Sequence, residues 1–279
     1  MRHLFLLVAL AGCQPSATPA AAPGLLAGRA EATEAEERTV ALGGRTLVLD
    51  GFAGDVRVET LAGATGVRVR FVRRARGATE ASARERLAAI TIEEGSDADL
   101  YQYVWRANRP TGIAEEGLSV DVVATVPPGA AVVVRTLAGG VAVDGPLGDL
   151  DVGVGAGTVV VGRAASRALR VDVRAGDVTV TAADLPAGAR WTVETGAGDV
   201  DLSVPDGASA RIDASTDAGR VADRGLPEAA RVVRSGGGRL DATLGRGGAD
   251  VRLHTAAGTV TVGAATDIDG TESGRVADG

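Results

Sequence analysis

Histidine and cysteine are nearly absent from this sequence, and their scarcity excludes several kinds of active site. The 279 residues include two histidines and one cysteine, Cys13. His3 lies in a leader that is expected to be removed, which leaves His254 as the single imidazole. Zinc sites with several histidine ligands and cysteine–histidine catalytic pairs are therefore excluded, and a Ser-His-Asp triad would have to use His254. Without a second cysteine, the chain forms no internal disulfide.

Aromatic residues are also scarce, at 3% of the chain, although 45% of the residues are hydrophobic. The apolar residues are mainly valine, alanine and leucine, which suit a narrow interior between closely spaced strands. Glycine contributes 40 residues but has no three-residue period, which excludes collagen. The glycines are therefore expected in turns.

Lysine is absent, so all 29 basic residues are arginine, and 36 acidic residues bring the net charge to −7. The absence of lysine indicates a coding bias rather than a binding device. An acidic surface repels phosphate backbones and anionic lipid headgroups. Nucleic acid is therefore not an expected partner.

The start of the chain has the pattern of a secretory leader. A short basic segment with Arg2 precedes an apolar run at residues 4–9. The next four residues match a bacterial lipobox, which is an aliphatic residue, two small residues and an invariant cysteine: Leu10, Ala11, Gly12 and Cys13. The resemblance to a lipoprotein signal implies that a signal peptidase recognises the first three and removes residues 1–12, and that Cys13 is lipidated. An ordinary signal peptide with a chance cysteine is the alternative, whereas the run is too short for a membrane-spanning helix.

Residues 13–38 are predicted to form a disordered tether between the lipid and the folded domain. The first part is rich in proline, alanine and serine, and the last part is acidic. Such a segment has too little apolar surface to fold alone. Two or three acyl chains, at ~0.8 kcal/mol per buried CH₂, would make the anchor durable. Gln14 stands where an aspartate usually retains a lipoprotein in the inner membrane, so it resembles an outer-membrane sorting signal.

A pattern of glycine, any residue, then valine or leucine recurs seven times. The copies begin at Gly139, Gly157, Gly176, Gly198, Gly219, Gly238 and Gly258, and Gly54 begins an earlier copy. The steps run from 18 residues (Gly139 to Gly157) to 22 residues (Gly176 to Gly198). A period near 20 residues is typical of stacked coils, in which equivalent glycines meet the same turn geometry.

Each repeat reads as a short strand, a glycine turn and a second short strand, with apolar residues facing inward. The predicted fold class is all-β, a single-stranded parallel β-solenoid (β-helix) with a short helical interruption near residues 79–89. A β-sandwich also has short strands, but it does not place the same residue type at the same position in every unit. Thr79 can cap the helix, and Ser82 is an alternative start. Residues 39–130 are expected to form the N-terminal strands and helix, and residues 131–279 the regular repeats.

The middle position of the turn is aspartate in three copies, Asp55, Asp177 and Asp199. A ladder of carboxylates could bind calcium. However, Arg220 and Arg239 fill the same position in other copies. Each aspartate is therefore expected to cap its own turn through a hydrogen bond from its side chain to the backbone, and no metal site is predicted.

Other charged residues are expected on outward strand positions. His254 alternates with Arg252 and Asp250, which indicates an exposed histidine rather than a catalytic base. The remaining outward residues form no cluster dense enough to predict a site: Asp149, Asp151, Asp172, Asp201, Asp213, Asp241, Arg170 and Arg211.

Tyr101, Tyr103 and Trp105 fall on one face of a predicted strand. They are interpreted either as a stripe that stacks on sugar or docks a protein, or as part of a cap beneath the helix. The cap is the favoured interpretation, and the three residues are also the best candidates for a contact surface.

From about Thr39 to Gly263 the arrangement resembles a bacterial family of candidate adhesins built from β-strand repeats, a domain of unknown function. In that family an anchor precedes early strands, a helical interruption and repeated Gly-x-Val coils. The resemblance implies a non-enzymatic, lipid-anchored envelope protein that presents a rigid β-solenoid to a protein or glycan, without a cofactor. A self-assembling scaffold and a polysaccharide-active enzyme are the alternatives. Lipidated Cys13 would hold the protein at the membrane, which is the outer membrane in a diderm organism.

Overall fold

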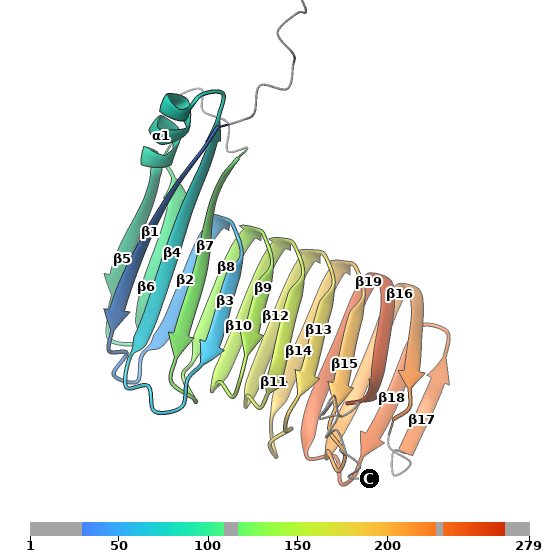
Figure 1. Ribbon diagram of the computed structural model, residues 1–279. Helices are drawn as coiled ribbons and strands as arrows, with labels where there is room; N and C mark the ends of the chain where they lie inside the picture. The colour runs from blue at the N-terminus through green and yellow to red at the C-terminus, as the bar shows by residue number, and fades with distance from the viewer. Residues whose placement is uncertain (1–29, 109–116, 227–230, 266–279) are drawn as a thin grey trace, which may run out of the picture.

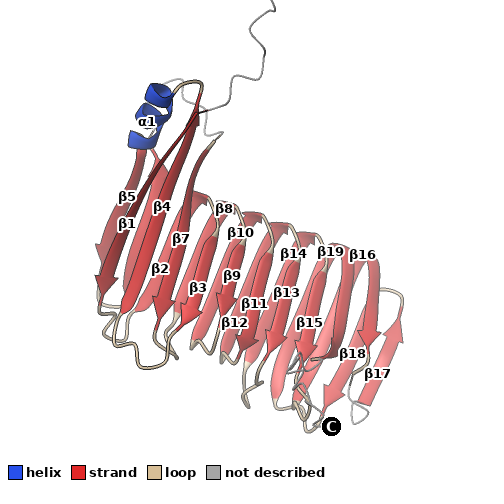
Figure 2. Cartoon of the chain, viewed as in Figure 1, coloured by secondary structure: helices blue, strands red, loops and turns tan. Residues whose placement is uncertain are grey.

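The structure is a computed structural model that describes residues 30–108, 117–226 and 231–265. Over these residues the protein is all-β with one helix (Figures 1 and 2). The 19 strands of the described residues belong to one mixed sheet, which winds into a flattened stack of coils. Cys13 and the rest of the lipobox lie outside the described residues.

Five central coils share one design, in which a strand on one face is followed by a glycine bend and a strand on the other face. These coils are β2–β3 (Thr46–Ala53, Val56–Thr60), β8–β9 (Val132–Ala138, Val141–Asp144), β10–β11 (Asp149–Ala156, Val159–Ala164), β12–β13 (Ala168–Ala175, Val178–Ala182) and β14–β15 (Arg190–Ala197, Val200–Val204). Equivalent strands pair in parallel, so that Val134, Val152 and Val171 lie in one row. All three are buried, because alternate residues of each strand point into the narrow core.

The bends are built on glycines that stack on one another. Gly176 has a φ of +145°, in the region that favours glycine. A Cβ at Gly176 would also collide with the carbonyl oxygen of Gly157 in the preceding coil. The same contact links the bends in stack order: Gly54, Gly139, Gly157, Gly176, Gly198, Gly258 and Gly219.

At the C-terminal end, the strands do not stack in chain order. β16 (Ala210–Arg224) and β19 (Ala249–Ala264) each run over both faces as one long strand. β19 lies between β14–β15 and β16, and it pairs in parallel with all three. β18 (Arg239–Leu244) pairs antiparallel with β16, and β17 (Arg231–Gly236) pairs antiparallel with β18. The chain thus turns back and inserts β19, the last strand of the described residues, inside the stack.

At the N-terminal end, antiparallel strands close both faces. The strands there are β1 (Ala30–Val40), β4 (Val67–Gly77), β5 (Ile90–Ser96), β6 (Leu100–Ala107) and β7 (Leu118–Val126). β6 and β7 pair in parallel with β2 and β3. β5 then pairs antiparallel with β6, β4 with β7, and β1 with β4.

The single helix, α1 (Glu80–Ala88), packs on β4 and β1. It begins at Thr79, whose hydroxyl accepts a hydrogen bond from the backbone N–H of Ser82 at 3.2 Å. Ala83 and Leu87 are its buried side chains. The structure therefore confirms the all-β class with a short helix near residues 79–89, and it identifies Thr79 as the cap.

Two features of the sheet correct the predicted fold. The prediction of a sheet that is parallel throughout is wrong, because hairpins at both ends reverse the strand direction. Gly238, predicted as a repeat glycine, lies outside the stacked bends, in the tight connection between β17 and β18.

The folded part also begins earlier than expected. β1 starts at Ala30, within the segment predicted as tether. Ala32 is the one buried residue of β1. Three glutamates of the strand instead pair with arginines of β4: Glu31–Arg76, Glu34–Arg73 and Glu37–Arg68. Backbone pairing with β4 and pairs of opposite charge thus order β1, which has too few apolar residues to be ordered by burial alone.

Candidate functional site

The aromatic residues predicted as a contact surface lie in the interior. Tyr101, Tyr103 and Trp105 are 8%, 0% and 1% exposed. The ring of Phe71 meets those of Tyr103 and Trp105 edge-on, with centroids 5.2 and 6.3 Å apart. Trp105 also lies against Gly51, where a side chain would collide with the indole. The contact-surface hypothesis is therefore wrong, and the rings are part of the N-terminal core.

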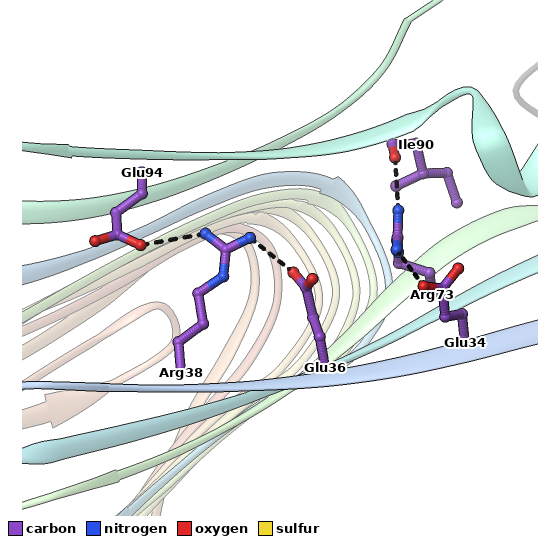
Figure 3. Close-up of polar contacts among 6 residues, drawn as sticks. All are labelled: Glu34, Glu36, Arg38, Arg73, Ile90 and Glu94. Atoms are coloured by element: carbon purple, nitrogen blue, oxygen red, sulfur yellow. Dashed lines mark hydrogen bonds and ion pairs between the residues drawn. The ribbon is translucent and has the colours of Figure 1, made fainter.

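An arginine beside these rings bridges the two faces of the stack. Arg38 of β1 binds Glu94 of β5 at 3.3 Å and Glu36 at 2.9 Å (Figure 3). Its guanidinium lies 5.7 Å from the ring centroid of Tyr103. The Arg38 side chain is 28% exposed, and its guanidinium covers the Tyr103 ring at the N-terminal end of the stack.

A second arginine ties three strands together at the same end. Arg73 of β4 binds Glu34 of β1 at 3.0 Å and donates to the backbone carbonyl of Ile90 in β5 at 3.1 Å (Figure 3). Because Arg38 and Arg73 are both committed to partners within the fold, we assign this cluster to closing the stack rather than to ligand binding.

The two tyrosines have a shared electrostatic environment. The Tyr101 hydroxyl donates to the carboxylate of Glu94. Burial, followed by this bond, raises the pKa of Tyr101. Burial, followed by the bond to Tyr101, raises the pKa of Tyr103 far above its ordinary value of 10.0.

The aspartates of the bends form structural hydrogen bonds. The Asp177 carboxylate accepts from the backbone N–H of Asp199 at 2.9 Å, and Asp199 accepts from that of Thr259 at 2.7 Å. Asp55 likewise accepts from Gly140 at 2.8 Å. The aspartates do accept hydrogen bonds from turn amides, but the prediction that each caps its own turn is wrong, because each carboxylate caps the turn of the neighbouring coil. The bond thus joins successive coils.

A group of outward polar side chains lies on β14, β19, β16 and β18, and we call it the C-terminal polar face. The strand register places its residues in three rows: Glu194, His254, Ser215 and Arg239; Thr192, Arg252, Asp213 and Asp241; and Arg190, Asp250, Arg211 and Thr243. An open hollow of about 280 Å³ is lined by residues of the second and third rows. This hollow is the candidate binding site.

Two carboxylates of the polar face share one arginine. Arg239 binds Asp213 at 3.0 Å and Asp241 at 3.3 Å. Its bond to Asp241 and the charge of Asp213 raise the pKa of Arg239. Without this arginine the facing carboxylates would repel each other, because they are direct partners across two antiparallel strands.

Three other arginines of the polar face remain available to a ligand. Arg190, Arg211 and Arg252 are exposed, and none has an ion-pair partner in the part of the chain that the structure describes. Arg190 and Arg211 lie on either side of Asp250, while Arg252 lies two residues further along the same strand as Asp250. The site therefore combines free guanidinium groups with carboxylates.

His254 lies between a hydroxyl and a carboxylate, which raises the question of a Ser-His-Asp triad. Its Nδ1 is 3.2 Å from the Ser215 hydroxyl, and its Nε2 is 3.6 Å from Asp217. Ser215, however, lies in the middle of β16, which pairs with β19 on one side and β18 on the other. The backbone N–H of the following residue, Thr216, donates to Gly238 at 2.9 Å. These strand bonds leave the local amides unable to stabilise an oxyanion, so the geometry does not support a serine nucleophile.

Among residues 30–108, 117–226 and 231–265, no group of three or more histidine, cysteine or acidic side chains is placed to hold a metal ion. Within the same ranges, α1 is too short and too polar to cross a membrane.

Sequence reasoning missed the clustering of these polar residues. It placed Asp213, Asp241 and Arg211 outward but found no cluster. Which residues lie beside them is set by the insertion of β19 between β14 and β16 and by the antiparallel direction of β18. The alternation of apolar and polar residues showed that these side chains face outward, but the repeat did not show the order of the strands that brings them together.

Comparisons with known proteins found no matching family model and no matching curated protein. Among solved structures, a candidate cell adhesion protein from Clostridium sporogenes is 14% identical, with a TM-score of 0.48 over 84% of this chain and 100% of that one. A candidate adhesin from Bacteroides fragilis is 10% identical, with a TM-score of 0.30 over 83% of this chain and 97% of that one. One from Parabacteroides distasonis is 11% identical, with a TM-score of 0.33 over 82% of this chain and 97% of that one.

Proposed function

We propose that this is a lipid-anchored, non-enzymatic protein of the bacterial cell envelope. In this proposal it presents a rigid β-solenoid and binds a partner through the C-terminal polar face, in the manner of an adhesin. The lipobox sequence ending at Cys13 supports the anchor. The free arginines Arg190, Arg211 and Arg252 support the binding role, because exposed guanidinium groups are ready donors to a partner.

The observation that carries the proposal is the separation of the two ends. The chain enters the fold at Ala30, the first residue of β1, and Cys13 lies upstream of it. From β1 to β16 the sheet advances through β4, β7, β3, β9, β11, β13, β15 and β19. At ~4.8 Å per strand, this path holds the polar face ~43 Å from the entry of the chain. A lipid at Cys13 would therefore leave the polar face at the end of the stack that lies farther from the anchor.

The proposed tether adds to that distance. A flexible segment between Cys13 and Ala30 would span ~20–25 Å, taking ~5–6 Å times the square root of the residue number. Together the tether and the stack would place the polar face at the outer limit of the molecule's reach.

Cell fractionation tests the anchor. The wild-type protein is expected in the membrane fraction and Cys13→Ala in the soluble fraction, because the acyl chains have no other attachment point. Ser16→Ala, a change of similar size in the same segment, should partition as the wild type does. Protease treatment of intact cells then distinguishes a surface orientation from a periplasmic one. Membrane partition of Cys13→Ala would refute the lipid anchor.

Two alternatives have separate tests. The outer edges of β5 and β17 pair on one side only within the described residues, which favours end-to-end assembly as a second candidate function. Size-exclusion chromatography at rising concentration would show growing oligomers in that case, and persistent monomers would contradict end-to-end assembly.

A polysaccharide-active enzyme would release product from a glycan panel, which the proposed binding protein leaves intact.

A further inference from the structure

We infer that the C-terminal polar face binds an acidic polysaccharide, with its anionic groups held by Arg190, Arg211 and Arg252 and its hydroxyl groups bonded to the intervening aspartates. This inference rests on the proposed binding role of that face and names the chemistry of the partner.

The arginines have the spacing of a repeated anion contact. Arg190, Arg252 and Arg211 belong to three adjacent strands, β14, β19 and β16. Arg190 and Arg211 are two strand spacings apart, about 9–10 Å at the backbone, and Arg252 lies about 7 Å along the strand from the Asp250 position between them. A guanidinium binds a carboxylate or sulfate through two parallel hydrogen bonds. Three such groups suit a chain that carries several anions rather than one isolated ion.

Arg211 lies beside the turn between β18 and β19. A Cβ at Gly247 would approach the Arg211 Cγ and Nε to 3.1 and 3.2 Å, so the arginine stem passes close to the backbone of that turn. Glycine at position 247 leaves this space to the stem, and the Arg211 side chain stays exposed to a ligand.

The carboxylates between the arginines favour a sugar over a phosphate polymer. Asp250 has no ion-pair partner within the described part of the chain, and Asp213 and Asp241 keep free lone pairs beside Arg239. Carboxylates accept hydrogen bonds from sugar hydroxyls, and a polyphosphate chain has no hydroxyls to donate to them. A partner with both anions and hydroxyls fits this alternation, whereas polyphosphate does not.

The shape of the face agrees with an extended chain. The hollow of about 280 Å³ is open and lies across the exposed surface of neighbouring strands. Thr243 contributes a hydroxyl at one margin of it. A linear polysaccharide can lie along such a surface and meet the arginines in succession.

Binding of defined polymers to the detergent-solubilised full-length protein tests the inference. The probes are alginate (carboxylates and hydroxyls), dextran sulfate (sulfates and hydroxyls), polyphosphate (anions without hydroxyls) and neutral dextran. The wild type should bind alginate or dextran sulfate, more weakly as salt rises, and the better of the two identifies the anion. Arg211→Gln/Arg252→Gln should weaken that binding roughly tenfold. Arg70→Gln/Arg106→Gln removes the same charge from exposed positions at the other end of the stack and should leave the affinity unchanged.

Several results would overturn the inference. Equal weakening by the two double variants would show a response to net charge alone. Polyphosphate binding as tight as alginate and dextran sulfate binding would remove the role of the hydroxyls, and equal binding of neutral dextran would remove the role of the anions. Absence of wild-type binding to both acidic polysaccharides would refute the partner class. The partition of Cys13→Ala does not depend on any polysaccharide, so it tests the proposed envelope function separately.

Discussion

The carbonyl oxygen of Gly157 occupies the place that the Cβ of any other residue at position 176 would take. This contact is steric and adds to the conformational demand of a φ of +145° at Gly176. Since equivalent glycines meet in the same way along the stack, the bends approach each other more closely than any side chain allows. The recurrence of glycine follows from this contact.

Gly176→Ala should destabilise the fold by about 3 kcal/mol or more, because the new methyl group must displace the backbone of the neighbouring coil. Gly207→Ala provides the matched control. Gly207 also has a positive φ, +77°, but its added Cβ would meet nothing within 4 Å. Its cost should be about 1–2 kcal/mol from conformation alone. Chemical denaturation of both variants measures the difference, and equal losses would show that the stacking contact contributes nothing.

Thr255→Val should cost about 1–2 kcal/mol. The buried Thr255 hydroxyl donates to the Gly198 carbonyl at 2.8 Å, and valine keeps the volume while leaving that carbonyl without its side-chain donor. Thr179→Val, at a half-buried outward position, should change the stability by less than about 0.5 kcal/mol. The unfolding midpoints of the two variants compare them directly. A loss at Thr179 as large as that at Thr255 would contradict the role of the hydrogen bond.

The two tyrosines should resist ionisation in the folded protein. Their raised pKa values mean that the fold favours the neutral phenols, so their contribution to stability is complete below the unfolded pKa near 10 and is lost as the pH rises through the folded values. Tyr101 and Tyr103 are the only tyrosines in the chain, so tyrosinate absorbance reports on this cluster alone. Absorbance should rise near pH 10 in denaturant but above that pH in the native protein. Tyr103→Phe should reduce the loss of stability at alkaline pH, whereas native titration of both residues near pH 10 would contradict their burial.

Paired cysteines test the position of β19. In a Cys13→Ala background, Thr192→Cys/Arg252→Cys should form a disulfide, because the two positions are direct partners on adjacent strands. Thr192→Cys/Asp213→Cys should not, since β19 separates these positions by two strand spacings, about 9–10 Å. Mobility on non-reducing gels distinguishes the products. The opposite pattern would place β16 directly against β14.

The repeat pattern was sufficient to predict the all-β class and the glycine bends, and the segment near residues 79–89 was sufficient to predict the helix. Alternation of apolar and polar residues is a local property, as is the capping preference of Thr79, and both can be read along the chain. The turn role of Asp177 and Asp199 was also readable, because the side chain is short enough to reach only a nearby backbone group. The sequence did not show that this group belongs to the next coil.

Burial of the aromatic stripe was decided by tertiary structure. Alternation places Tyr101, Tyr103 and Trp105 on one face of a strand, but it does not say whether that face is covered. Phe71 and Arg38, both distant in sequence, cover it. The tether boundary failed for a related reason, since β1 is ordered by glutamate–arginine pairs with β4 rather than by its own apolar residues.

By itself, the sequence determined the structure of one coil and the need for coils to stack, because glycine, valine and alternating polarity act within about 20 residues. The order of the coils was decided only in three dimensions. β16 and β19 carry equivalent glycine bends, so the local sequence pattern does not show which of the two strands pairs with β14. In the structure the chain folds back through β17 and β18, and β19 takes the position beside β14. That choice places β19, which carries Asp250 and Arg252, between the strands that carry Arg190 and Arg211, and so it assembles the polar face.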